Sequence, residues 1–302
     1  GGLRLTYDTL ATFFKYVNIS NDVRESNPKY GYFQSEKDCV EKIFSKLKLV
    51  GKDDEYIRHP FSYIMEAADD IAYCCSDIED GYKVGLIPYE EASAALYDIA
   101  LPRITRLGIK DRASDVLRNS GLGDHIKYLR TAATDSLIWE CCESFFNSPG
   151  RGGTMNYQRM LEGDFKDSLV KISNLYTEYK RGKDLSEKYV YGSKTKILRE
   201  QGAHQVIRFL LGVFSDAIEN WHASSGNIED LDERSRYAFM IMHRVYDNKG
   251  FEREGSEKRI RDIKSCDPID SYRMMVDFVS GMTDSYALKM ARTRRGIDIG
   301  EL

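Results

Sequence analysis

Four carboxylates, which can bind cations, and one phenol recur at intervals of about one helical turn in segment 58–81. They are Glu66, Asp69, Tyr73, Asp77 and Asp80. On an α-helix this spacing places them on one face, because residues three and four apart are neighbours there. No lysine or arginine lies between Arg58 and Lys83, so no ion pair within the helix relieves the repulsion between the carboxylates. The row predicts a cation from outside the helix, either a metal ion or basic side chains; a solvated acidic face is the alternative.

The helix that must position this row has recognisable ends in the sequence. Pro60 suits the first turn, where its missing N–H would have no partner in any case. Gly81 suits the left-handed position that follows a last turn. The opposite arc of the same helix is apolar and predicts the face that packs in the core. Its members are Ile64, Ala68, Ile71, Cys75 and Ile78.

Hydrophobic spacing of three and four residues along the chain predicts an all-α fold. The predicted helices cover 63–81, 89–101, 123–146, 165–179, 194–221, 233–246 and 270–292. Turn-forming residues at 147–156 predict an exposed, mobile loop, and 189–191 is the best strand candidate. We expect one helical body, because no stretch has the composition of an interdomain linker.

The segment from Glu66 to Gly81 closely resembles the deoxyguanosine triphosphate triphosphohydrolases (dGTPases) of the HD superfamily. Three more stretches resemble the same family in the same order. They are 5–10 leading to Lys15 and Tyr16, then 30–37, then 281–288. The resemblance implies a helical enzyme that splits a deoxynucleoside triphosphate into deoxynucleoside and tripolyphosphate. The sequence leaves the base preference open.

The resemblance also implies roles for single residues. Family members hold Mg²⁺ or Mn²⁺ with a histidine, an adjacent His-Asp pair and a later aspartate, which Asp69 matches. Tyr73 and Asp77 match residues that line the sugar pocket. Lys15 and Tyr16 match contacts to the triphosphate, and Lys37 is a further candidate for that group.

The sequence departs from the family in one respect, because no His-Asp dipeptide occurs in its 302 residues. In the family this dipeptide, and the catalytic histidine and glutamate after it, precede the stretch that matches 5–10. We therefore interpret 1–302 as the C-terminal portion of a dGTPase-like enzyme whose HD half is absent, rather than as a degenerate pseudoenzyme. We expect the isolated chain to contain no catalytic residue, to bind no metal tightly and to be inactive.

Composition restricts the partners. The net charge of −4 gives no general basic field for nucleic acid. No apolar run approaches the roughly 20 residues of a membrane span, so no membrane partner is expected. Six cysteines without a CxxC spacing predict buried free thiols in a reducing cytoplasm.

Two further expectations concern assembly and an alternative function. The resemblance implies a homo-oligomer, such as a hexamer. The basic segment 289–295 is typical of a helix C-terminus, and contact with single-stranded DNA is its alternative role. The alternative to an enzyme is a noncatalytic helical module that binds nucleotide or single-stranded nucleic acid and regulates a partner.

Overall fold

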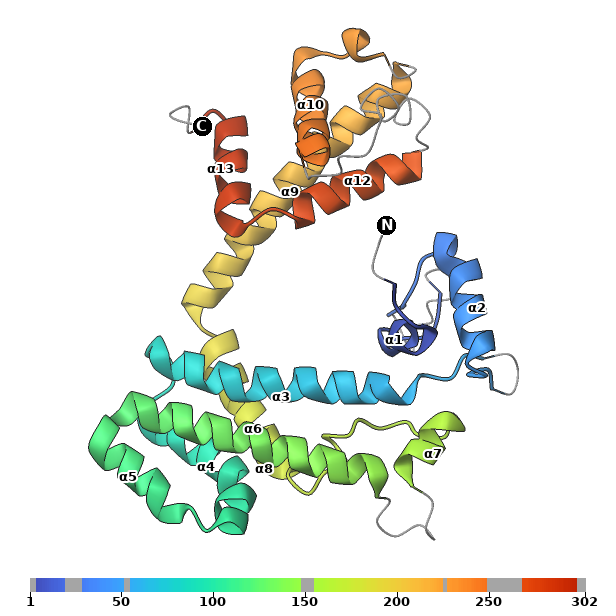
Figure 1. The fold of residues 1–302 in the computed structure, drawn as a ribbon. Coiled ribbons are helices and arrows are strands. Elements are labelled where there is room, and N and C mark those ends of the chain that lie inside the picture. The colour runs from blue at the N-terminus through green and yellow to red at the C-terminus, as the bar shows by residue number, and fades with distance from the viewer. Residues whose placement is uncertain are drawn as a thin grey trace. The chain divides into compact units, whose positions relative to one another are not determined.

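The computed structural model describes residues 4–19, 29–51, 55–147, 155–224, 227–248 and 268–297. Helices are the regular secondary structure of these residues (Figure 1), and extended pairing within them is limited to two isolated bridges. The predicted all-α fold class is confirmed. Contacts divide the chain into two compact units, Gly1–Ser193 and Lys194–Leu302, where one body was expected.

The first unit is built around four helices that pack on one another. Its helices are α1 (Tyr7–Thr12), α2 (Lys37–Lys46), α3 (Pro60–Lys83), α4 (Tyr89–Leu107), α5 (Lys110–Ser120), α6 (Leu122–Phe146), α7 (Asn156–Leu161) and α8 (Tyr176–Ser186). The α3 helix lies against α6 and α8, and α4 lies against α6. Fully buried side chains such as Ile78, Leu96 and Leu137 form the core between them. On the surface of α4 and α6, the Arg106 guanidinium lies 4.2 Å from the ring centroid of Trp139.

A smaller core in the same unit joins α1, α2 and the loops beside them. Phe44 of α2 stacks on Tyr56 with ring centroids 4.7 Å apart. Ser62 connects this core to α3, because its hydroxyl donates a hydrogen bond to the Thr12 carbonyl at 2.8 Å. Gly31 allows the chain to pass against Tyr16, since a Cβ at Gly31 would lie 1.8 Å from the Tyr16 carbonyl oxygen. The short α1 segment and the residues after it are thereby fixed beside the start of α3.

The second unit has a core of its own around one long helix. Its elements are α9 (Lys194–Ala223), the 3₁₀ turn η4 (Ile228–Asp230), α10 (Glu233–Asn248), α12 (Pro268–Ser280) and α13 (Asp284–Arg294). Trp221 of α9 stacks on Phe239 of α10, with ring centroids 4.4 Å apart. Phe214 meets Phe278 of α12 edge to face at 5.1 Å. The described core therefore combines helices that are distant in the sequence.

The predicted helix over 165–179 is wrong for residues 165–175, which form turns and irregular backbone, and it is confirmed only from Tyr176, where α8 begins. Serine side chains bond to nearby backbone here: the Ser168 hydroxyl accepts from the Lys171 amide at 3.3 Å, and Ser173 donates to the Val170 carbonyl at 2.7 Å. Such local bonds compete with helix formation, which explains the error.

Three other boundaries also differ from the prediction. The strand candidate 189–191 is instead part of a π-helical turn, η3 (Glu187–Tyr191). The predicted helix 270–292 is interrupted at Gly281, and Thr283 then caps α13 by accepting a hydrogen bond from the Tyr286 amide at 3.3 Å. Gly81 lies inside α3 rather than after it, and Gly85 takes the left-handed conformation with φ of +74°.

Most of the loop predicted at 147–156 lies outside the described residues. Of the five cysteines described, Cys74, Cys75 and Cys141 are buried, as expected. Cys39 and Cys142 are exposed, which corrects the expectation that all are buried. Among the described helices, none has the length and apolar character that crossing a membrane requires.

Candidate functional site

The start of α3 is fixed by the two residues that the sequence places there. Pro60 occupies the first helical position, and the Nδ1 atom of His59 accepts a hydrogen bond from the Phe61 amide at 3.2 Å. The other ring nitrogen of His59 lies 3.7 Å from Asp8 Oδ1 on α1. Burial lowers the pKa of His59 despite the opposing effect of Asp8, which favours the neutral ring that caps the helix.

The buried face of α3 differs from the predicted arc at its beginning. The arc is buried from Ile71 onward, but Ile64 and Ala68 are exposed. Tyr63 is buried in their place, because its hydroxyl donates a hydrogen bond to the Phe165 carbonyl at 3.0 Å. At its first turn, α3 therefore contacts the segment after α7 through Tyr63.

Glu66 lies between two cations that come from outside the acidic row. Lys15 Nζ is 2.9 Å from Glu66 Oε1, and Arg58 Nη1 is 2.8 Å from Oε2. Arg58 is held in turn by the ring of Tyr63, 4.0 Å away, and by a 2.7 Å hydrogen bond to the Ser62 carbonyl. For Glu66, the predicted external cation is therefore confirmed, and it consists of basic side chains.

These contacts determine the charge of the group. Burial alone would raise the pKa of Glu66, but the hydrogen bonds from Lys15 and Arg58 outweigh it and lower that pKa. Burial alone would lower the pKa of Lys15, but the bond to Glu66 raises it above its ordinary value. Glu66 and Lys15 are consequently both charged at neutral pH. Burial, followed by the negative charge of Glu66, raises the pKa of the neighbouring Asp70.

A cleft of about 1070 Å³ opens beside this group, within the first unit. Its walls are residues 15–18, 50–51, 55–58, Tyr63 and 162–166. Two of the predicted triphosphate contacts, Lys15 and Tyr16, therefore lie together on its wall with Arg58. Lys166 adds a third cation, and Phe165 adds an aromatic surface. Three carboxylates, those of Glu55, Glu162 and Asp164, also line the cleft, so an anionic ligand would bind through the three cations and not through a net positive charge.

The remaining predicted site residues do not line this cleft. Lys37 is exposed and pairs with Glu41 at 3.6 Å. Asp69 is exposed on α3, and Tyr73 is 62% exposed one turn later. Asp77 is half-buried and accepts a hydrogen bond from the hydroxyl of Tyr191. The sugar-binding and metal-binding roles of these α3 residues stay predictions.

The described residues do not form a metal site by themselves. Nowhere among them do three His, Cys, Asp or Glu side chains gather closely enough to hold an ion. Asp69 offers one carboxylate, which alone does not make a catalytic metal centre. The metal ligands that the resemblance implies beyond Asp69 have no counterpart in the sequence.

Sequence reasoning missed Arg58 and Tyr191. Arg58 carried a usable signal, because it is the last cation before the acidic row and lies two residues before the helix start. Its side chain can therefore fold back over the first two turns. No sequence signal pointed to Tyr191. It is 114 residues from Asp77, and it belongs to a turn that the sequence predicted as a strand.

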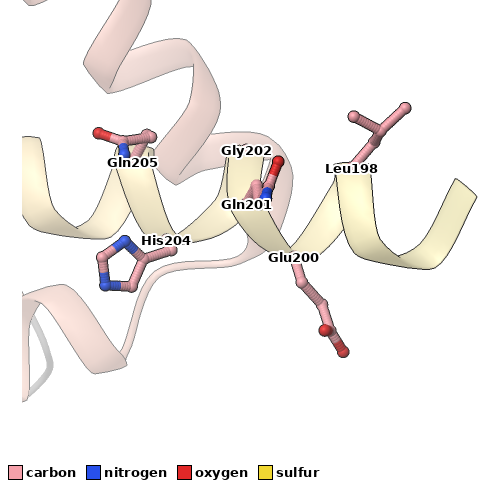
Figure 2. Close-up of a pocket in the computed structure, with 6 residues that line it drawn as sticks. All are labelled: Leu198, Glu200, Gln201, Gly202, His204 and Gln205. Carbon is pink, nitrogen blue, oxygen red and sulfur yellow. The ribbon is translucent and has the colours of Figure 1, made fainter. Parts of the chain in front are cut away.

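A second depression of about 640 Å³ follows the first turns of α9 in the other unit. Figure 2 shows Leu198 pointing to one side of this helix and Glu200 to the other. His204, further along, is exposed. All of its lining residues belong to a single helix, so their polar groups diverge and do not converge on a ligand.

Comparison with known proteins agrees with the resemblance found in the sequence. The chain is 29% identical over 310 residues to a Pseudomonas aeruginosa protein named deoxyguanosinetriphosphate triphosphohydrolase-like protein, a match that covers 98% of this chain and 61% of that protein. A Synechocystis protein of the same name is 25% identical over 314 residues, covering 99% and 61%. A Klebsiella pneumoniae deoxyguanosinetriphosphate triphosphohydrolase is 25% identical over 307 residues, covering 95% and 57%.

These matches confirm that the chain resembles proteins of this name along nearly all of its length. The chain spans about three-fifths of the length of the curated relatives it matches. No family model matches the chain.

Proposed function

We propose that the chain is the substrate-side portion of a triphosphohydrolase that cleaves dGTP into deoxyguanosine and tripolyphosphate. The observation that carries the proposal is the cleft on whose wall Lys15 and Tyr16, the predicted triphosphate contacts, lie together with Arg58. The names of the relatives support the reaction class.

Lys15 and Arg58 supply the cationic groups that a triphosphate would need, while the carboxylates of Glu55, Glu162 and Asp164 also line the cleft. Lys15 and Arg58 are both cationic at neutral pH, and Glu66 holds them in fixed positions without cancelling both charges. Charged N–H donors bind phosphate oxygens through short hydrogen bonds. The Nε atom of Arg58 is buried and has no hydrogen-bond partner among the described residues, so this guanidinium retains donor capacity. We assign Lys15, Arg58 and Tyr16 to the phosphate end of the substrate.

The sugar end of the substrate is assigned to later turns of α3. Asp77 follows Glu66 by eleven residues, which corresponds to about 16 Å along the helix axis at 1.5 Å per residue. Lys15 and Arg58 are tied to α3 through Glu66, so the phosphate contacts are anchored to the helix that carries the proposed sugar contacts. Asp77 would accept a hydrogen bond from the 3′-hydroxyl, while the exposed ring of Tyr73 would crowd the 2′ position and disfavour ribose.

In this proposal, Asp69 is the one described residue that is assigned to bind a divalent cation. Mg²⁺ or Mn²⁺ prefers hard oxygen ligands and, when bound, supplies Lewis-acid chemistry at a phosphoryl oxygen. The described residues provide no further ligands, so this chain accounts for substrate binding and not for the chemical step. We therefore propose that the isolated chain is inactive. Oligomerisation and contact with single-stranded DNA stay predictions.

The test compares the isolated chain with the product of the complete reading frame. Both are incubated with dGTP and Mn²⁺, and release of tripolyphosphate and deoxyguanosine is measured by ion-exchange chromatography. We expect turnover only by the complete protein, and none after Asp69→Ala in that protein. Binding of dGTP without turnover by the complete protein would favour the noncatalytic module, and turnover by the isolated chain would contradict its inactivity.

A further inference from the structure

The turn η3 that follows α8 has an uncommon geometry. The Gly192 amide donates a hydrogen bond to the Glu187 carbonyl, five residues earlier, at 3.1 Å. Single π-helical turns of this kind occur mostly as insertions in helices and frequently at functional sites. The wider turn changes the direction in which its last side chain, Tyr191, leaves the backbone compared with a continued α-helix. The position of Tyr191 is therefore a product of this local geometry.

The π-helical turn is attached to α3 by close packing. Val190 lies against Gly81, where a Cβ would be only 2.8 Å from Val190 Cγ2 and 2.6 Å from Ile87 Cδ1. A Cβ at this position would force the side chains of Ile87 and Val190 to shift, so the turn packs closely against α3 at Gly81. This contact is one turn beyond Asp77 on the same helix.

The turn is also attached to α4 by polar contacts. The Tyr189 hydroxyl donates a hydrogen bond to Glu91 Oε1 at 2.5 Å and accepts one from Lys188 Nζ at 2.8 Å. Tyr191 is therefore held between two anchoring points, Val190 on α3 and Tyr189 on α4. A side chain so placed has little freedom to move independently of α3.

The Tyr191 hydroxyl uses this position to donate a hydrogen bond to Oδ2 of Asp77. Burial, followed by this bond, raises the pKa of Tyr191, so the phenol stays protonated at neutral pH and remains a donor. A carboxylate has about four acceptor positions, so Asp77 can accept from Tyr191 and from a substrate hydroxyl together. The χ2 torsion of an unrestrained aspartate has a broad distribution, whereas a bonded oxygen fixes the plane of the carboxylate.

We propose that Tyr191 is a positioning residue that orients the Asp77 carboxylate toward the 3′-hydroxyl of the substrate's deoxyribose. The inference rests on the proposed function, because that function assigns Asp77 to the sugar. It adds Tyr191, which belongs to η3 and not to α3, to the residues that act on the sugar of the substrate. It also assigns a function to the π-helical turn. Tyr191 acts through Asp77 and has no assigned contact with the reacting phosphorus.

The decisive experiment uses a substrate analogue that lacks the hydroxyl in question. Binding of dGTP and of 2′,3′-dideoxyguanosine triphosphate (ddGTP) to the full 302-residue chain is measured by isothermal titration calorimetry for wild type and Tyr191→Phe. We expect Tyr191→Phe to weaken dGTP binding by about tenfold, equivalent to about 1.4 kcal/mol. Binding of ddGTP should change by less than about twofold, because its sugar has no hydroxyl for Asp77 to accept.

Tyr97→Phe is the matched control, since it removes a hydroxyl from a half-buried tyrosine of α4 and should leave both affinities unchanged. Equal losses for dGTP and ddGTP in Tyr191→Phe would indicate a merely structural role and overturn the inference. An unchanged dGTP affinity would overturn it as well. If the wild-type chain binds neither nucleotide, it is the proposed function that fails. The wild-type titrations with dGTP and ddGTP show this outcome, so the two failures can be told apart.

A second measurement tests the contact without any nucleotide. Tyrosine labelled with ¹³C at Cζ reports the ionisation of each phenol by NMR, and the Tyr191 signal is the one absent from Tyr191→Phe. We expect Asp77→Asn to lower the pKa of Tyr191, because the carboxylate no longer disfavours the phenolate. An unchanged Tyr191 titration would show that the two side chains do not interact, and the inference would fail.

Discussion

Glu66 shows how one residue acquires a role that its neighbours on the same row do not share. Its side chain is 16% exposed, whereas Asp69 three residues later is exposed. The difference comes from Lys15 and Arg58, which reach the first turns of α3 and no further. The acidic row is therefore not one uniform feature: Glu66 at its beginning is paired with two cations, Asp69 is exposed, and Asp77 accepts a hydrogen bond from Tyr191.

The first prediction concerns the stability that Glu66 provides. Replacing Glu66 with Gln removes the negative charge that Lys15 and Arg58 share, leaving two cations close together. Since a hydrogen bond to a charged group contributes about 1.5–3 kcal/mol and partial exposure reduces this, we expect a loss of about 2 kcal/mol in the free energy of unfolding. Urea denaturation measures it. The control Glu41→Gln removes an exposed ion pair with Lys37 and should cost less than about 0.5 kcal/mol.

If Glu66→Gln lowers the free energy of unfolding by no more than Glu41→Gln does, the partly buried network of Glu66, Lys15 and Arg58 stabilises the fold no more than an ordinary surface ion pair. Far-UV circular dichroism should show the same helix content in both variants, which separates loss of the network from misfolding.

The second prediction gives the pH dependence of the same network. The pKa of Glu66 in the folded chain lies below its ordinary value of about 4.5. At a pH between the folded and the unfolded pKa of Glu66, the unfolded state binds more protons than the folded state. The contribution of Glu66 to the free energy of unfolding is therefore present above about pH 4.5 and is lost as the pH falls through the folded pKa. We expect the stability difference between wild type and Glu66→Gln to narrow below about pH 4.5. A difference that stays constant down to pH 3 would contradict this assignment.

Among the elements, α3 and α9 were predicted well because each carries a hydrophobic stripe, which is buried from Ile71 onward in α3 and from Leu210 onward in α9. The failures have physical causes in particular residues. Ser168 and Ser173 bond to local backbone and stop a helix that the spacing suggested. Thr283 begins a new helix where the apolar pattern continues. The π-helical turn around Val190 was predicted as a strand because its aromatic and β-branched residues favour strands in isolation.

The third prediction contrasts two glycines inside helices. In Gly81→Ala the new Cβ would lie 2.6 Å from Ile87 and 2.8 Å from Val190, so neighbouring side chains must shift. We expect a loss of about 2 kcal/mol, in the range of overpacked cores. Gly202→Ala on α9 meets nothing within 4 Å and should stabilise by about 0.5–1 kcal/mol through helix propensity. Thermal unfolding distinguishes them, and a destabilising effect of the same size at both positions would contradict the packing argument.

For the whole molecule, the sequence could not predict the contacts that define the candidate site. Lys15 and Glu66 are 51 residues apart, and Asp77 and Tyr191 are 114 apart. No local pattern encodes which distant residue will lie beside a given helical turn. The family resemblance supplied Lys15, Tyr16 and Asp77 as a set, but Arg58 and Tyr191 emerged only from the packing.

The fourth prediction follows from the two compact units with separate cores. We expect two transitions in differential scanning calorimetry, with Leu137→Ala lowering one and Phe214→Ala lowering the other. Each substitution removes a large, fully buried side chain and should cost about 3 kcal/mol in its own unit. A single transition lowered by both variants would show that the units unfold as one cooperative body.

The two tryptophans have a practical consequence for such experiments. Trp139 lies on the surface under the Arg106 guanidinium in the first unit, and Trp221 is buried against Phe239 in the second. The chain contains only these two indoles. A polar and a shielded environment give them different emission maxima, so the protein carries one optical label for each unit. Trp139→Phe and Trp221→Phe would leave single-label versions in which fluorescence follows one unit at a time, without attaching any dye.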